Sequence, residues 1–212
     1  MRRSSNGPSA SPDERPTPAR GLDITDAQPR LLYAGGVPRT IDSETLAAAA
    51  RSVPTNGLPL QIGLFGTGDR LERARELADR DGVMFVGGWV GRAEIAAAAA
   101  ASAAGLVPYH PTPDFLMGMP NKVAEYLAFG LPVITSLHDG PVRRLCEGQE
   151  AGFLYTFGDA TSLSRAMSSA VARWEARGRA AEARLQQLQR DTLDAARSTS
   201  SLADCLMSLA SP

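Results

Sequence analysis

Residues 118–136 read GMPNKVAEYLAFGLPVITS, and this stretch holds one complete helix-to-strand unit. Pro120 suits the first turn of a helix, and Gly130 is the residue type that commonly ends one. The run PVIT at 132–135 is short, apolar and bounded by turn residues, as expected of a strand buried in a parallel sheet. The stretch therefore predicts a helix over residues 120–129 that leads into a buried strand.

Five further apolar runs resemble PVIT, and each ends in glycine or another turn residue. They are LLYA (31–34), LQIGLF (60–65), VMFV (83–86), GLVPY (105–109) and GFLY (152–155). Helical patterns alternate with these runs, at residues 43–53, 69–81, 92–103, 141–148 and 161–173. Six strands alternating with helices predict an α/β fold, a doubly wound Rossmann-like parallel sheet with right-handed crossovers. In such a sheet, ligands bind at the carboxyl ends of the strands.

The two ends of the chain differ from this middle part in composition. Residues 1–30 contain five prolines, four serines and few large apolar side chains, and are predicted to be disordered because they bury too little surface. Residues 31–175 form the predicted domain, and residues 176–212 form a C-terminal helical extension. In this extension, spaced apolar residues indicate one or two amphipathic helices that pack on the domain, with a partner-binding helix as the alternative. These residues are Ala181, Leu185, Leu188, Leu193 and Ala196.

Composition and charge exclude several classes of function. The chain has 22 Lys and Arg against 23 Asp and Glu, a net charge of -1, so no nucleic-acid partner is expected. Cys146 and Cys205 make neither a disulfide framework nor a zinc motif, and are expected to be reduced thiols of a cytoplasmic protein. No apolar run reaches the ~18 residues of a membrane-spanning helix, so no transmembrane segment is expected.

The start of the helix at 120–129 is a candidate binding site for a nucleoside diphosphate. Free amides and the helix dipole attract an anion there. Lys122 in the first turn opposes the dipole, at a cost of about 0.3–1 kcal/mol, unless an anion is bound. Glu125 lies on the same side as Asn121 and Lys122, and a carboxylate accepts two hydrogen bonds from a vicinal diol such as a ribose. The alternative is a solvated Lys122–Glu125 ion pair of little energetic value.

Other polar or glycine-rich positions have weaker signals. Gly66-Thr67-Gly68 follows a strand and precedes a helix, so it is either part of a dinucleotide fingerprint or a tight turn that needs glycine torsions. The helix at 69–81 is expected to begin with a capping box, because Asp69 stands three residues before Glu72. His110 and His138 are loop residues or line the crevice, and neither belongs to a recognisable hydrolase triad.

The stretch PNKVAEYLAFGLPVITS resembles the donor-site signature of retaining glycosyltransferases of the GT-B fold, the family-four type. The resemblance spans about residues 31–173 and includes LLYAGGV, LQIGLFGTGDRLERARELA, VMFVGGWVGRAEI, GLVPYHPTPD and GFLYTFGD in the family's order. It corresponds to the C-terminal, nucleotide-sugar-binding domain of that fold. It implies transfer of a sugar from a nucleoside diphosphate donor of the UDP or GDP type with retained configuration, without a further cofactor or metal.

The same resemblance assigns roles to individual residues. Glu125 matches the glutamate that binds the ribose hydroxyls, and Lys122 stabilises negative charge on the departing diphosphate; these two are the expected catalytic residues. The expected donor-binding residues are Gly35, Gly36, Arg39, Gly66, Gly68, Trp89, Val90, Gly118, Met119, Pro120, Asn121, Lys122 and Glu125. His110 and Asp114 lie at the rim. Met117 stands where the family often has a second glutamate, which Asp114 would replace only with a realigned loop.

The length of 212 residues limits what the resemblance implies. In GT-B enzymes an N-terminal Rossmann-like domain holds the acceptor, and this sequence has no room for one. The chain is therefore expected to act with a separate acceptor-binding chain or to lack that domain. A non-catalytic nucleotide-sugar-binding module is the alternative that Met117 favours, and a Rossmann-type dinucleotide protein is a third.

Overall fold

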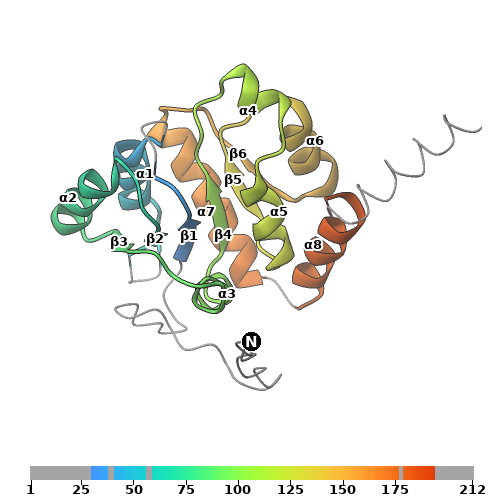
Figure 1. Ribbon diagram of the computed structural model, residues 1–212, viewed down its shortest axis with the longest axis horizontal. Coiled ribbons are helices and arrows are strands. Elements are labelled where there is room, and N and C mark those ends of the chain that lie inside the picture. Colours follow the sequence, from blue (N-terminus) through green and yellow to red (C-terminus); the bar gives the residue numbers. More distant parts are fainter. Residues whose placement is uncertain (1–29, 38–40, 56–58, 177–178, 194–212) are drawn as a thin grey trace, which may run out of the picture.

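A six-stranded sheet runs through the middle of the structure, with helices on both faces (Figure 1). The computed structural model describes residues 30–37, 41–55, 59–176 and 179–193. The strands are β1 (Arg30–Ala34), β2 (Gln61–Phe65), β3 (Met84–Gly87), β4 (Ala104–Val107), β5 (Val133–Thr135) and β6 (Gly152–Leu154). The helices are α1 (Ser43–Arg51), α2 (Leu71–Asp81), α3 (Arg92–Ala100), α4 (Pro113–Met117), α5 (Asn121–Ala128), α6 (Gly140–Gln149), α7 (Ala160–Ala176) and α8 (Arg179–Thr192). The predicted α/β fold class is confirmed.

The order of the strands places one crevice at the centre of the sheet. All neighbouring strands are parallel, in the order β3-β2-β1-β4-β5-β6. The order changes direction between β1 and β4, where Leu31 pairs with Ala104 and Leu32 with Gly105. The loops that follow β1 and β4 therefore leave the sheet in opposite directions, which opens a crevice at their carboxyl ends.

Each face of the sheet has its own apolar core. Leu31 and Tyr33 of β1 belong to one cluster, together with residues of α1, α2 and α7 such as Leu46. Leu32 belongs to the other, together with residues of α3, α5, α6 and α8 such as Leu127. Both faces of the central strands are thus buried, which explains why their sequences are continuous apolar runs rather than alternating ones.

Two local predictions differ from the structure. The expected capping box at Asp69 is wrong: α2 begins at Leu71, and no side chain caps it. Instead the amide of Arg70, the N-cap residue, donates to the carbonyl of Val37 at 3.1 Å, so the loop is held by the neighbouring loop. The helix α4 had no counterpart among the sequence patterns, because none of its five residues is buried and no apolar periodicity marks it.

The structure describes part of the sequence at each end of the predicted domain. Arg30, assigned by composition to the disordered segment, is the first residue of β1 and is only 2% exposed. In the C-terminal extension, α8 packs against α5, and Leu185 is 3% exposed within the core. The predicted disorder before residue 30, Cys205 and Ala196 lie outside the described residues. Among the described helices, none has the length and apolarity needed to cross a bilayer.

Candidate functional site

The loops after the first three strands form one layer held by backbone hydrogen bonds. The amide of Gly35 donates to the carbonyl of Phe65 at 2.8 Å, and that of Val37 donates to Thr67 at 2.8 Å. The amide of Gly66 donates to the carbonyl of Gly88 at 3.1 Å. Because these bonds run from loop to loop, the carboxyl ends of β1, β2 and β3 keep a common geometry.

Gly66 and Gly68 are required by the contact between two of these loops. Their φ angles are 150° and 149°, in the region that favours glycine. A Cβ atom on Gly66 would lie 1.8 Å from the carbonyl oxygen of Gly35, and one on Gly68 would lie 2.5 Å from that of Val37. The close approach of the backbones therefore accounts for both glycines, as the tight-turn interpretation predicts.

Helix α5 is attached to the end of β1 through a single residue, Ala34. The hydroxyl of Tyr126 accepts a hydrogen bond from the Ala34 amide at 3.0 Å, and the ammonium of Lys122 donates to the Ala34 carbonyl. The Tyr126 ring fills the space above Gly105 in β4, where a Cβ atom would lie 2.3 Å from it. One residue of α5 thus contacts both strands that border the crevice.

Lys122 lies in a confined position against the glycine turn. A Cβ atom on Gly35 would lie 1.9 Å from Nζ of Lys122, and Nζ lies 5.0 Å from the centroid of the Tyr33 ring. Burial lowers the pKa of Lys122, and the charge of Glu125 partly opposes this. Lys122 and Glu125 make no ion pair in the described part of the chain, so the alternative of a solvated pair is not what the structure shows.

Two cavities adjoin α5. The first, which we call the glycine cavity, has a volume of about 400 Å³ and is lined by Gly36, Val37, Thr67, Gly68, Asp69, Tyr109, Phe115 and Lys122. The second, which we call the Trp89 cavity, has a volume of about 480 Å³ and is lined by Trp89, Val90, Gly91, Arg92, Ile95, Ala124, Glu125, Ala128, Phe129 and Gln189. The helix contributes Lys122 to the first cavity and Glu125, one turn later, to the second.

The structure brings six of the thirteen predicted donor-binding residues to these cavities, in two groups. Gly36, Gly68 and Lys122 line the glycine cavity, while Trp89, Val90 and Glu125 line the Trp89 cavity. Gly35 and Gly66 belong to the layer of loops described above. The four residues before Lys122 form the approach to α5 and its first residue and line neither cavity: Gly118, Met119, Pro120 and Asn121. Arg39 lies outside the described residues.

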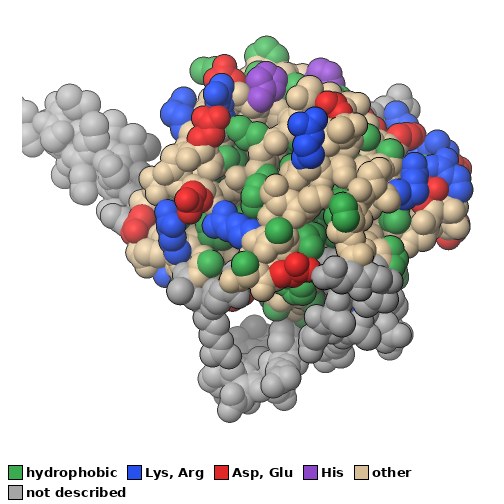
Figure 2. Space-filling view, turned by 180° about the vertical axis from the view of Figure 1, so that it is seen from behind, with side chains coloured by type: hydrophobic (Ala, Val, Ile, Leu, Met, Phe, Trp, Pro, Cys, Tyr) green, Lys and Arg blue, Asp and Glu red, His purple; other side chains and the backbone are tan. Residues whose placement is uncertain are grey.

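The predicted rim residues lie near the crevice but outside the two cavities. The His110 ring contacts the Phe157 ring edge to face, with centroids 4.8 Å apart. Nδ1 of His138 lies 3.2 Å from the carbonyl oxygen of Ser136. Asp114 is exposed in the first turn of α4. Figure 2 shows histidine side chains at the upper edge of the molecule, the edge at which α4 lies in Figure 1.

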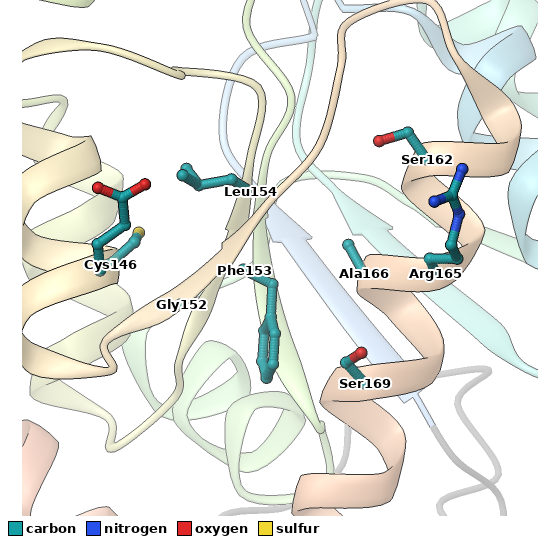
Figure 3. Close-up of a pocket in the computed structure, with 9 residues that line it drawn as sticks. Cys146, Gly152, Phe153, Leu154, Ser162, Arg165, Ala166 and Ser169 are labelled. Atoms are coloured by element: carbon teal, nitrogen blue, oxygen red, sulfur yellow. The ribbon is translucent and has the colours of Figure 1, made fainter.

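A further cavity lies away from the crevice, at β6. It has a volume of about 430 Å³, and Figure 3 shows Cys146 of α6 on one side of β6 and Ser162, Arg165 and Ser169 of α7 on the other. Burial raises the pKa of the Cys146 thiol to about 12. The thiol is therefore protonated at neutral pH and is a poor nucleophile. None of the predicted donor-site residues lines this cavity.

Sequence reasoning missed two residues that shape the crevice. Tyr126 has no motif that marks it in the sequence, although its position four residues after Lys122 places both side chains on the same face of α5. Gln189 is not marked either, because it lies some 60 residues from the signature, on a helix whose only sequence signal is its apolar spacing. In both cases the contact is long-range, and no local pattern marks it.

The fold is a doubly wound α/β domain with a crevice at the carboxyl ends of its strands, and comparison with known families assigns the chain to one class. Residues 28–173 match the family described as Glycosyl transferases group 1. This match covers more than half of the chain, so the protein belongs to that family of glycosyltransferases. Comparison with curated proteins finds no match.

Solved structures of glycosyltransferases share the fold. Sucrose-phosphate synthase from Thermosynechococcus elongatus has 22% identity and a TM-score of 0.71 over 89% of this chain and 47% of its own. Anabaena HepE, solved with UDP and glucose, has 18% identity and a TM-score of 0.66 over 86% and 49%. WaaG, a glycosyltransferase of lipopolysaccharide biosynthesis, has 20% identity and a TM-score of 0.60 over 81% and 45%. The chain thus spans about half the length of these three relatives, which are GT-B enzymes.

The attachment of α5 to Ala34 generates a stability prediction. Tyr126→Phe keeps the ring over Gly105 but leaves the buried Ala34 amide without its acceptor. We expect the free energy of unfolding to fall by about 1–3 kcal/mol, the usual cost of an unsatisfied buried donor. Urea unfolding followed by circular dichroism measures this change. A loss below about 0.5 kcal/mol would show that the hydroxyl does not hold the helix to the strand.

Proposed function

We propose that the crevice binds a nucleoside diphosphate sugar of the UDP or GDP type as the donor of a glycosyl transfer. The diphosphate lies in the glycine cavity, and the ribose and base lie in the Trp89 cavity. The observation that carries this proposal is the position of α5, which presents a cation to one cavity and a carboxylate to the other, one turn apart. The membership of the glycosyltransferase family supports it.

The glycine cavity suits a diphosphate. Lys122 supplies a positive charge that no carboxylate neutralises by direct contact in the described part of the chain. No side chain caps the N-terminus of α5. The amide of Val123 donates to the carbonyl of Pro120 at 2.9 Å, which leaves the amides of Asn121 and Lys122 available to an anion. Among the described residues that line this cavity, Asp69 is the one acidic residue, and as an acceptor it can bind a hydroxyl group of the sugar.

The Trp89 cavity suits a nucleoside. The Glu125 side chain is exposed there and accepts both hydrogen bonds that a ribose diol can donate. The Trp89 side chain is 78% exposed, although a tryptophan is usually covered by protein. Its indole offers an aromatic face on which a base can stack.

In catalysis, Lys122 and the amides at the start of α5 act electrostatically. They stabilise the negative charge that develops on the diphosphate as the bond to the sugar breaks. Glu125 contributes to catalysis by orienting the donor through the ribose. The family resemblance also implies that the anomeric configuration is retained. By the same resemblance, the backbone of residues 118–121 contacts the diphosphate and the sugar.

A second candidate function is donor binding without catalysis. Met117, which is 80% exposed in α4, stands at the position where the family often has a glutamate, so that carboxylate is missing from this position. Asp114, in the same helix α4, is a further carboxylate that the realigned loop would use. The turnover experiment below separates the two candidates.

The acceptor would be held by a further half of the GT-B fold. The chain spans 47% of the sucrose-phosphate synthase chain and 49% of the HepE chain, so a second half completes the fold in those proteins. We propose that an acceptor-binding domain, of the kind that a separate chain could supply, faces the carboxyl edge of the sheet. It would close the crevice and exclude water from the departing diphosphate.

The two-cavity arrangement predicts different effects for two variants in isothermal titration calorimetry. Lys122→Met weakens the binding of both UDP and inorganic pyrophosphate by about tenfold or more, because a charge-assisted hydrogen bond is lost. Glu125→Gln weakens the binding of UDP or GDP but leaves the binding of pyrophosphate unchanged, since pyrophosphate has no ribose. Glu147→Gln, at an exposed carboxylate of α6, is the matched control.

Three results would contradict the two-cavity arrangement. The first is the absence of UDP and GDP binding by the unmodified chain. The second is equal binding of UDP by the unmodified chain and by both variants. The third is binding of NAD without UDP or GDP, which would favour a dinucleotide protein.

The need for an acceptor-binding partner predicts the outcome of a turnover assay. The purified chain with UDP-glucose or GDP-mannose and simple sugar acceptors is expected to give no transfer product by mass spectrometry. Addition of a chain that supplies the acceptor-binding half is expected to restore transfer. Robust transfer by the chain alone would disprove the requirement, and the absence of turnover with every partner would favour the non-catalytic binding module.

A further inference from the structure

Helix α8 lies beyond the segment that matches the family, yet it lines the proposed nucleoside cavity. The match ends at residue 173, and α8 spans Arg179–Thr192. Of this helix, Gln189 is the residue that reaches the Trp89 cavity within the described chain. The part of the cavity wall that Gln189 forms therefore lies outside the segment that matches the family.

The position of α8 is determined by packing. Leu185, one turn before Gln189, is 3% exposed in the core that α5 and β4 share. Gly130 at the end of α5 lies directly under the helix, because a Cβ atom there would lie 3.0 Å from Cβ of Glu182. The backbone hydrogen bond from Leu193 to Gln189, at 2.8 Å, continues the helix past the cavity. These contacts hold Gln189 at the cavity wall.

The amide group of Gln189 is free to bind a ligand. It makes no hydrogen bond within the described residues, although the residue is half-buried. The amide of Gln187, on the same helix, differs in this respect: its nitrogen donates to Asp191 at 3.0 Å, and its oxygen accepts from Arg190 at 2.8 Å. The polar groups of Gln187 are therefore hydrogen-bonded within its own helix, while those of Gln189 can form hydrogen bonds to a ligand in the cavity.

The chemistry of the cavity indicates what Gln189 contacts. A carboxamide both accepts and donates hydrogen bonds, and the edge of a nucleobase presents acceptors and donors side by side. Arg92, on the same cavity, only donates, and Glu125 only accepts. Gln189 is thus the lining side chain that can match both groups of a base edge at once.

We propose that Gln189 is a specificity-determining residue that hydrogen-bonds the edge of the base of the bound nucleoside diphosphate. This inference rests on the proposed function, because it requires the base to lie in the Trp89 cavity. It assigns to α8 a role in choosing the nucleotide, in addition to covering α5.

The test compares Gln189→Ala with Gln187→Ala by calorimetry against UDP, GDP, ADP and inorganic pyrophosphate. Gln189→Ala is expected to weaken binding of the preferred nucleotide by about five- to twentyfold, the loss of one or two neutral hydrogen bonds. The affinities for the other nucleotides fall by less, so the difference in affinity between the preferred nucleotide and the others becomes smaller. Binding of pyrophosphate stays unchanged, and Gln187→Ala behaves as the unmodified chain. Equal melting temperatures of the two variants show that α8 remains folded.

Failure of this inference differs from failure of the proposed function. Unchanged affinities and an unchanged order of preference in Gln189→Ala would overturn the role of Gln189 and leave the donor site intact. An equal loss for all ligands, pyrophosphate included, would also overturn it, because a base contact cannot act on pyrophosphate. The absence of nucleotide binding by the unmodified chain would overturn both.

Discussion

Two hydrogen bonds to Ala34 hold helix α5 at the centre of the molecule. Tyr126 binds its amide and Lys122 binds its carbonyl, so one turn of the helix is fixed to the last residue of β1. Because β1 and β4 border the point where the strand order changes direction, this attachment decides how α5 stands over the crevice. The position of Glu125 follows, since it precedes Tyr126 on the same turn.

The attachment has an energetic consequence for the site. Lys122 is drawn into a half-buried position beside Gly35, where desolvation lowers its pKa. A ligand anion would offer this ammonium a stronger partner than the neutral carbonyl of Ala34. Under the proposed function, this position of Lys122 suits the negative charge of the donor diphosphate. Gly35 leaves room for the Lys122 side chain, and Gly66 and Gly68 leave room for the backbone of the neighbouring loop.

Much of the fold could be predicted because it depends on local sequence. The apolar runs from LLYA to GFLY correspond to the six strands, and Pro120 and Gly130 bracket α5. The predictions were wrong where contacts between distant segments determine the local structure. The start of α2, for example, depends on the hydrogen bond to Val37 rather than on a cap by Asp69. The same holds for the site. The family signature contains Lys122 and Glu125, whereas the role of Tyr126 depends on Ala34, 92 residues away, and that of Gln189 on the packing of α8.

The central claim is that one nucleoside diphosphate spans both cavities across α5. A crystal structure of the chain with bound UDP or GDP tests it most directly. The account predicts the diphosphate oxygens within hydrogen-bond distance of the Lys122 ammonium and both ribose hydroxyls on the Glu125 carboxylate. Nucleotide bound elsewhere, for instance in the cavity beside β6, or a diphosphate that contacts neither Lys122 nor the start of α5, would contradict it.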